Sequence, residues 1–115
     1  MNNYEKNCYT FIQNLLRELA QDYDAQYQNM EDVARWNLPE EIGQEWLDAE
    51  GMVRTLEEGK CISLDFLNAL KDIIFTFAIE FEKPNNPVWT HEAMKTSDFW
   101  KMQRTRAKRL LDEYV

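Results

Sequence analysis

The sequence predicts an all-α fold: one small domain, residues 1–115, arranged as a helical bundle or array of four main helices with one or two short ones. Apolar residues recur at spacings of three and four along most of the chain, which is the spacing that lines one face of a helix. The longest apolar run, Ser63–Glu82, forms one broad apolar arc on such a helix. Only three Gly and three Pro are present, too few for a turn-rich β fold.

The first helix is predicted over residues 3–27. Its apolar side comprises Tyr4, Cys8, Phe11, Ile12, Leu15, Leu16, Leu19 and Tyr23. Because Cys8 shares this side, we expect a buried structural thiol rather than a reactive one. Asn29 is then expected to cap a short helix over Met30–Trp36, whose first-turn acids favour the positive end of the helix dipole.

A third helix is predicted from Pro39, which suits the first helical position, to Gly59, which suits a helix end. One side of it carries Ile42, Trp46, Ala49, Val53 and Leu56. Gly51 lies within this stretch and is expected to bend or split the helix, because glycine weakens a helix interior.

The central helix begins after Ser63, a suitable N-cap, and ends at Lys83-Pro84. Phe75 and Ile79 lie on its otherwise polar side. We expect another helix to cover them; the alternative is a patch that contacts a partner. The alternation over Phe75–Phe81 also suits a strand, but no convincing second strand is present to pair with it.

The last third of the chain contains its clearest loop, Pro84–Pro87. Thr90 is predicted to cap a short helical turn that runs through Lys95. Ser97 is predicted to cap the last helix, Asp98–Tyr114.

Charge is unevenly distributed along a chain whose net charge is −8. Residues 22–58 contain eleven acids against two arginines, a net charge of −9, whereas residues 99–115 carry +3. One interpretation is that both are solvated surfaces, with the basic last helix lying over part of the acidic region. The other is an acidic docking surface, since opposite charge steers association.

Aromatic residues lie within the acidic segment, and protein interfaces often centre on Trp and Tyr. Trp46 is on an apolar helix face and is expected in the core, whereas Trp36 is the aromatic residue least suited to a core position. The predicted partner-binding residues are Asp22, Asp24, Glu31, Asp32, Trp36, Glu40, Glu41 and Glu45.

Residues for catalysis or metal binding are sparse. His91 is the only histidine, nothing in the spacing pairs it with Cys61, and one histidine excludes a bundle di-iron site. We therefore predict no catalytic set, no metal and no cofactor. Glu45-x-x-Asp48 resembles half of the motif of the all-α nucleoside triphosphate pyrophosphohydrolases, but the other half, Glu-x-x-Glu, is missing.

The acidic composition argues against nucleic-acid binding. The sequence also lacks a secretory signal pattern and an apolar run of membrane-spanning length, and its cysteines form no CxxC pair. We expect a cytoplasmic protein with no membrane association.

Together these observations predict a non-catalytic protein-binding module. The specific hypothesis is an acidic inhibitor or immunity-type protein that occludes the active site of a basic toxin, such as a nuclease. Two alternatives remain open. One is a carboxylate-metal-dependent nucleotide hydrolase that uses Glu41, Glu45 and Asp48. The other is a structural or adaptor subunit that self-associates through Phe75 and Ile79.

Overall fold

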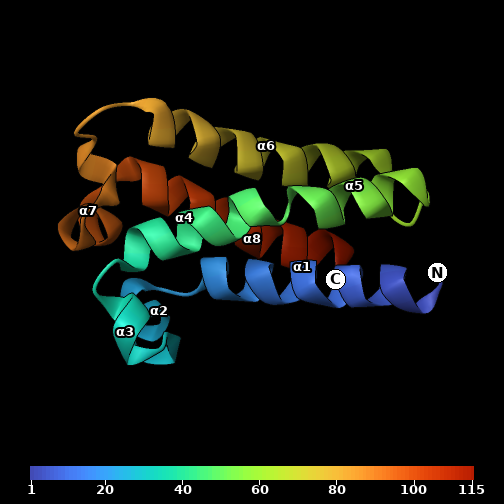
Figure 1. The fold of residues 1–115 in the computed structure, drawn as a ribbon, viewed down its shortest axis with the longest axis horizontal. Helices are drawn as coiled ribbons and strands as arrows, with labels where there is room; N and C mark the ends of the chain where they lie inside the picture. The colour runs from blue at the N-terminus through green and yellow to red at the C-terminus, as the bar shows by residue number, and fades with distance from the viewer.

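The computed structural model describes all 115 residues, which form helices joined by short connections (Figure 1). The elements are α1 (Asn3–Ala20), α2 (Tyr23–Asn29), α3 (Asp32–Arg35), α4 (Leu38–Asp48), α5 (Glu50–Glu58), α6 (Leu64–Glu82), a 3-10 turn (Pro87–Trp89), α7 (His91–Thr96) and α8 (Asp98–Tyr114). No strand is present, so the all-α prediction is confirmed and the strand alternative at Phe75–Phe81 is wrong.

Four rods make up the bundle: α1, the pair α4–α5, α6 and α8. In Figure 1 α4 and α5 run nearly end to end in front, between α6 above and α1 below, with α8 behind them. Both α4–α5 and α8 pack against α1 and α6, from opposite sides. The core between the rods holds 21 buried apolar residues, and Trp46, Trp100 and Phe77 are its largest fully buried side chains.

The first predicted helix is divided into two. It ends at Ala20, and α2 starts afresh because the Asp22 side chain accepts a hydrogen bond from the backbone N–H of Ala25 at 2.9 Å. The predicted helix over residues 3–27 is therefore wrong in its C-terminal part. Asn29 closes α2 instead of capping the next helix, and α3 is shorter than the predicted Met30–Trp36.

The apolar side of α1 is also narrower than predicted. Cys8 is buried with a free thiol, as expected, whereas Tyr4 and Phe11 are exposed. The main neighbours of α1 are α4–α5 and α8, and the edges of its predicted apolar side remain exposed to solvent.

The third predicted helix is split, at Ala49, into α4 and α5. Pro39 lies in the first turn of α4, and Gly59 ends α5, both as predicted. The break comes two residues before Gly51. The buried Ala49 forms the bend between the two helices.

Three predicted N-caps are confirmed. Ser63 accepts a hydrogen bond from the backbone N–H of Phe66, Thr90 from Ala93, and Ser97 from Trp100. The prediction that another helix covers Phe75 and Ile79 is wrong. They are 62% and 38% exposed, because both neighbours of α6 pack on its other faces.

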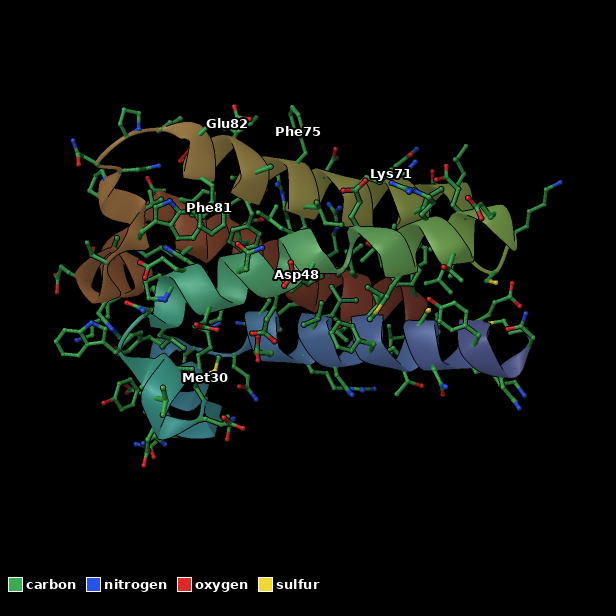
Figure 2. The ribbon with its side chains drawn as sticks, viewed as in Figure 1. Met30, Asp48, Lys71, Phe75, Phe81 and Glu82 are labelled. Carbon is green, nitrogen blue, oxygen red and sulfur yellow. The ribbon has the colours of Figure 1, made fainter.

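An aromatic cluster closes one end of the bundle. Trp89 stacks on Phe81 with ring centroids 4.0 Å apart, and its indole N–H donates to the carbonyl oxygen of Glu80 at 3.2 Å. The sticks in Figure 2 place Phe81 between α6 and α4. Gly43 of α4 lies against this stack: a Cβ added there would come within 2.8 Å of the Trp89 ring and 3.0 Å of Phe81.

Replacing Gly43 with alanine should therefore destabilise the fold, by about 1 kcal/mol, because the added methyl group forces Trp89 off Phe81. Denaturant unfolding followed by tryptophan fluorescence measures this. Gly51→Ala is the matched control: its Cβ meets nothing within 4 Å, so it should stabilise the helix by up to about 1 kcal/mol. An equal gain in stability at both positions would contradict the close packing at Gly43.

Candidate functional site

Helices α2 and α3 form a small lobe below one end of the four rods (Figure 1). We call residues 22–37 the lobe. Arg35 holds it together: its guanidinium donates to the carbonyl oxygens of Tyr27 (2.8 Å) and Gln28 (2.9 Å), pairs with Asp32 and lies 5.1 Å from the centre of the Tyr27 ring. The only basic side chain of the lobe is thus occupied by internal contacts.

The most exposed apolar side chains of the lobe are Val33 and Trp36, at 90% and 84% exposure. Beside Trp36 is an open pocket of about 360 Å³ lined by Tyr27, Asp32, Arg35, Trp36 and His91. A tryptophan this exposed on a short helix contributes almost nothing to the core. Exposed apolar groups beside a concave, partly aromatic surface are typical of a binding site.

His91 connects the lobe to the bundle. Its Nε2 lies 3.1 Å from the carbonyl oxygen of Trp36, and its Nδ1 lies 2.7 Å from the Tyr23 hydroxyl. Because a carbonyl only accepts, the neutral ring carries its proton on Nε2 and accepts from Tyr23 on Nδ1. The histidine is therefore a bridge between α7, α2 and α3.

A second polar contact anchors the lobe more deeply. The Gln26 side chain is 1% exposed and donates to the carbonyl oxygens of Glu18 and Leu19 at the end of α1, both at 3.2 Å. Its Oε1 accepts from the guanidinium of Arg104 at 2.9 Å, and the same guanidinium donates to the carbonyl oxygen of Met94 at 2.7 Å. Gln26 thus satisfies the C-terminus of α1 and joins α2 to α8.

The predicted partner-binding residues occupy three places. Glu31, Asp32 and Trp36 lie on the exposed side of the lobe, and Glu40 and Glu41 follow in the first turn of α4. Asp22 and Asp24 line a different depression, of about 370 Å³, together with Tyr23, Lys95, Arg104 and Lys108. Those two acids therefore face basic side chains of this same chain.

Glu45 lies apart from the other predicted residues. It is partly buried against Glu18 of α1, and each of the two carboxyl groups has an oxygen with neither solvent exposure nor a hydrogen-bond partner. Burial first, and then the charge of Glu18, raise the pKa of Glu45 to about 8. Burial also raises the pKa of Glu18. Glu45 is thus held protonated at neutral pH.

The acidic segment and the basic last helix meet at α2, where Arg104 donates to Gln26 and where Asp22 and Asp24 share a depression with Arg104 and Lys108. α8 lies across the bundle from α4–α5, and no ion pair joins α8 to residues 22–58. The interpretation that α8 covers part of the acidic region therefore agrees with the structure at α2, whereas α4 and α5 lie on the other side of the bundle from α8. Besides Glu45, seven acids of the segment have no ion-pair partner within 4 Å: Asp22, Asp24, Glu31, Glu40, Glu41, Asp48 and Glu58.

Two further observations concern metal binding and membrane spanning. Nowhere do three or more His, Cys, Asp or Glu side chains converge closely enough to hold a metal ion. None of the helices has the length and apolar character needed to cross a membrane.

Two important residues were missed by sequence reasoning. Val33 carried a weak signal, since it is the apolar residue of a short acidic helix with no room for a buried face. Gln26 carried no such signal, because a glutamine on a helix is normally solvated.

Comparison of the chain with protein-family models, curated proteins and solved structures finds no match.

Proposed function

We propose that this chain is a non-catalytic binding protein of the inhibitor or immunity type, acting in the cytoplasm. Its lobe docks on a basic protein, most specifically a nuclease-like toxin, and covers the active site. The observation that carries the proposal is the exposed pair Val33 and Trp36, set among carboxylates without a free basic side chain beside them.

The chemistry of this surface suits such a partner. A tryptophan that loses most of its exposure on binding supplies the kind of apolar anchor that dominates protein interfaces. Carboxylates around it attract a cationic surface and accelerate encounter. Nucleases that bind a polyanion present cationic active sites, so an acidic lobe competes with their substrate.

The proposed contact surface is the lobe and the start of α4: Glu31, Asp32, Val33, Trp36, Glu40 and Glu41. Asp22 and Asp24 contribute to the long-range field from their position near Lys95 and Lys108. Glu45, uncharged at neutral pH, is left out of this contact surface.

The test is a salt-dependent pull-down from the native host, followed by assay of the captured protein. The wild-type chain should retain a basic protein at low salt, lose it at high salt, and inhibit its enzymatic activity in purified form. Trp36→Ala should weaken this binding by about 2 kcal/mol or more, as expected for an interface anchor. Glu31→Lys/Glu41→Lys should mainly slow association.

Leu64→Ala is the matched control, because Leu64 is also exposed but belongs to the first turn of α6. It should bind as the wild type does. Capture that is equal in all variants, or a captured protein whose activity the chain leaves unchanged, would reject the proposal. Circular dichroism of each variant checks that the fold is retained.

A further inference from the structure

A second surface lies on the outer side of α6, away from the lobe. Phe75 points out of the bundle there, on the same side as Glu82 (Figure 2). Neither α5 nor α8 covers it, and Phe75 remains 62% exposed. An exposed phenylalanine in the middle of the longest helix has no role in the core of a single chain.

Next to Phe75 is a groove of about 550 Å³ between α5 and α6. Its apolar lining consists of Val53, Ile74, Phe75 and Ala78. Its margin carries two ion pairs, Arg54 with Glu50 and Lys71 with Glu57, both at 2.8 Å. An apolar centre with a charged margin is the usual anatomy of a protein–protein interface.

The sequence of α6 makes this surface complementary to itself. Lys71, Phe75, Ala78 and Glu82 follow one another at steps of four, three and four, and at about 100° per residue they fall on one line along the helix. In the forward direction the line contains a base, a large apolar group, a small apolar group and an acid. In the reverse direction it contains the opposite charge and size at every position.

We propose that two copies of this chain associate through α6, antiparallel about a two-fold axis between Phe75 and Ala78. In this register Lys71 of each copy faces Glu82 of the other, and the phenyl ring of each Phe75 lies over Ala78 of the other. Every contact is made twice, as an isologous interface requires. Lys71 keeps its bond to Glu57, since an ammonium group has three donors.

The charges select this register over its neighbour. Sliding one helix so that Phe75 faces Ile79 of the other copy brings Asp72 against Glu82, and like charges at an interface are unfavourable. In this shifted register Phe75 also no longer faces the small side chain of Ala78. The dimer leaves the two lobes free, because the lobe and α6 lie on opposite sides of the bundle (Figure 1). This inference is thus independent of the proposed function.

Sedimentation equilibrium of the purified full chain tests the association. The wild type should dimerise with a Kd below about 1 mM, and Phe75→Glu should raise this Kd at least about tenfold. Val33→Glu is the control, because it places the same charge on an exposed apolar position of the lobe, and it should dimerise as the wild type does. A monomeric wild type, or a dimer indifferent to Phe75→Glu, would overturn the proposal.

Charge exchange tests the register. Lys71→Glu and Glu82→Lys should each weaken dimerisation, whereas an equimolar mixture of the two should form a heterodimer in which both ion pairs are restored. The double variant should dimerise more tightly than Lys71→Glu. Lys71→Glu and the double variant both lose the ion pair of Lys71 with Glu57, and both gain the same repulsion between position 71 and Glu57. A difference in dimerisation between these two variants therefore comes from the contact of position 71 with position 82. Failure of the mixture to associate more tightly than either variant alone would overturn this arrangement.

Discussion

Replacing Gln26 with leucine is expected to lower the free energy of unfolding by about 3 kcal/mol, although leucine is close to glutamine in size. The substitution leaves the carbonyl oxygens of Glu18 and Leu19 without their buried donor. It also removes the Oε1 acceptor of Arg104, a half-buried cation whose pKa burial already lowers. Losing one partner of a buried polar contact costs the full desolvation of the groups left behind.

Urea unfolding at pH 7 measures the loss, and Gln28→Leu is the control. Gln28 belongs to the same helix but is exposed, and its side chain makes no hydrogen bond, so this variant should stay within about 0.5 kcal/mol of the wild type. Equal stability of the two variants would show that Gln26 does not anchor the lobe.

The same substitution connects stability to the proposed function. Tyr23 and Met30 of the lobe pack against the core but are only partly buried, so the position of the lobe depends strongly on the polar contacts of Gln26 and His91. Hydrogen exchange should therefore accelerate in α2 and α3 of Gln26→Leu more than in α6. A partner that needs Trp36 in a fixed position would then bind Gln26→Leu more weakly, even where the rest of the chain stays folded.

Elements defined by local chemistry were predictable from the sequence. The N-caps at Ser63, Thr90 and Ser97 depend on side chains three residues from the amide that they satisfy, and the buried face of α6 depends on helical spacing. The end of α1 was not predictable in this way. Apolar spacing continues from Leu19 to Tyr23 across the break and outweighs the local signal, which is the Asp22 cap of α2, while the tertiary contact of Gln26 with the last turn of α1 favours the same break.

The sequence predicted which kinds of residue make up the candidate site, but not which of them lie together. The sequence showed an acidic segment with an exposed tryptophan, and the structure places Trp36 at 84% exposure. It did not show that α2 folds back, which turns Asp22 and Asp24 toward Lys95 and Lys108. Nor did it show that α4 packs with Glu45 against Glu18. Because these acids are close together in the sequence, we expected more of them to share one surface than the structure shows.

The pair formed by Glu45 and Glu18 predicts an unusual dependence of stability on pH. The folded chain binds a proton at Glu45 up to a pKa of about 8, whereas the unfolded chain releases it near the ordinary value of 4.5. The folded state thus holds more protons between these values. Stability should be greatest at the acidic end of this window and should fall as pH rises through 8. After allowance for partial exposure, we expect a loss of about 2 kcal/mol.

Unfolding by urea at a series of pH values from 5 to 9 measures this slope in the wild type and in Glu45→Gln. Glutamine is neutral throughout and can still hydrogen-bond to Glu18, so the variant should show a flatter profile and should be more stable than the wild type above pH 8. Glu58→Gln, exposed at the end of α5 and not among the groups that shift the pKa of Glu45, should keep the wild-type slope. If Glu45→Gln loses stability with pH as steeply as the wild type does, the buried proton is not at this pair. If only Glu45→Gln shows a flat profile, the buried proton belongs to the contact between α1 and α4. This contact lies beside the Gln26 side chain that anchors the lobe. Alkaline pH should therefore loosen the lobe, which carries the proposed binding surface, before it loosens the rest of the bundle.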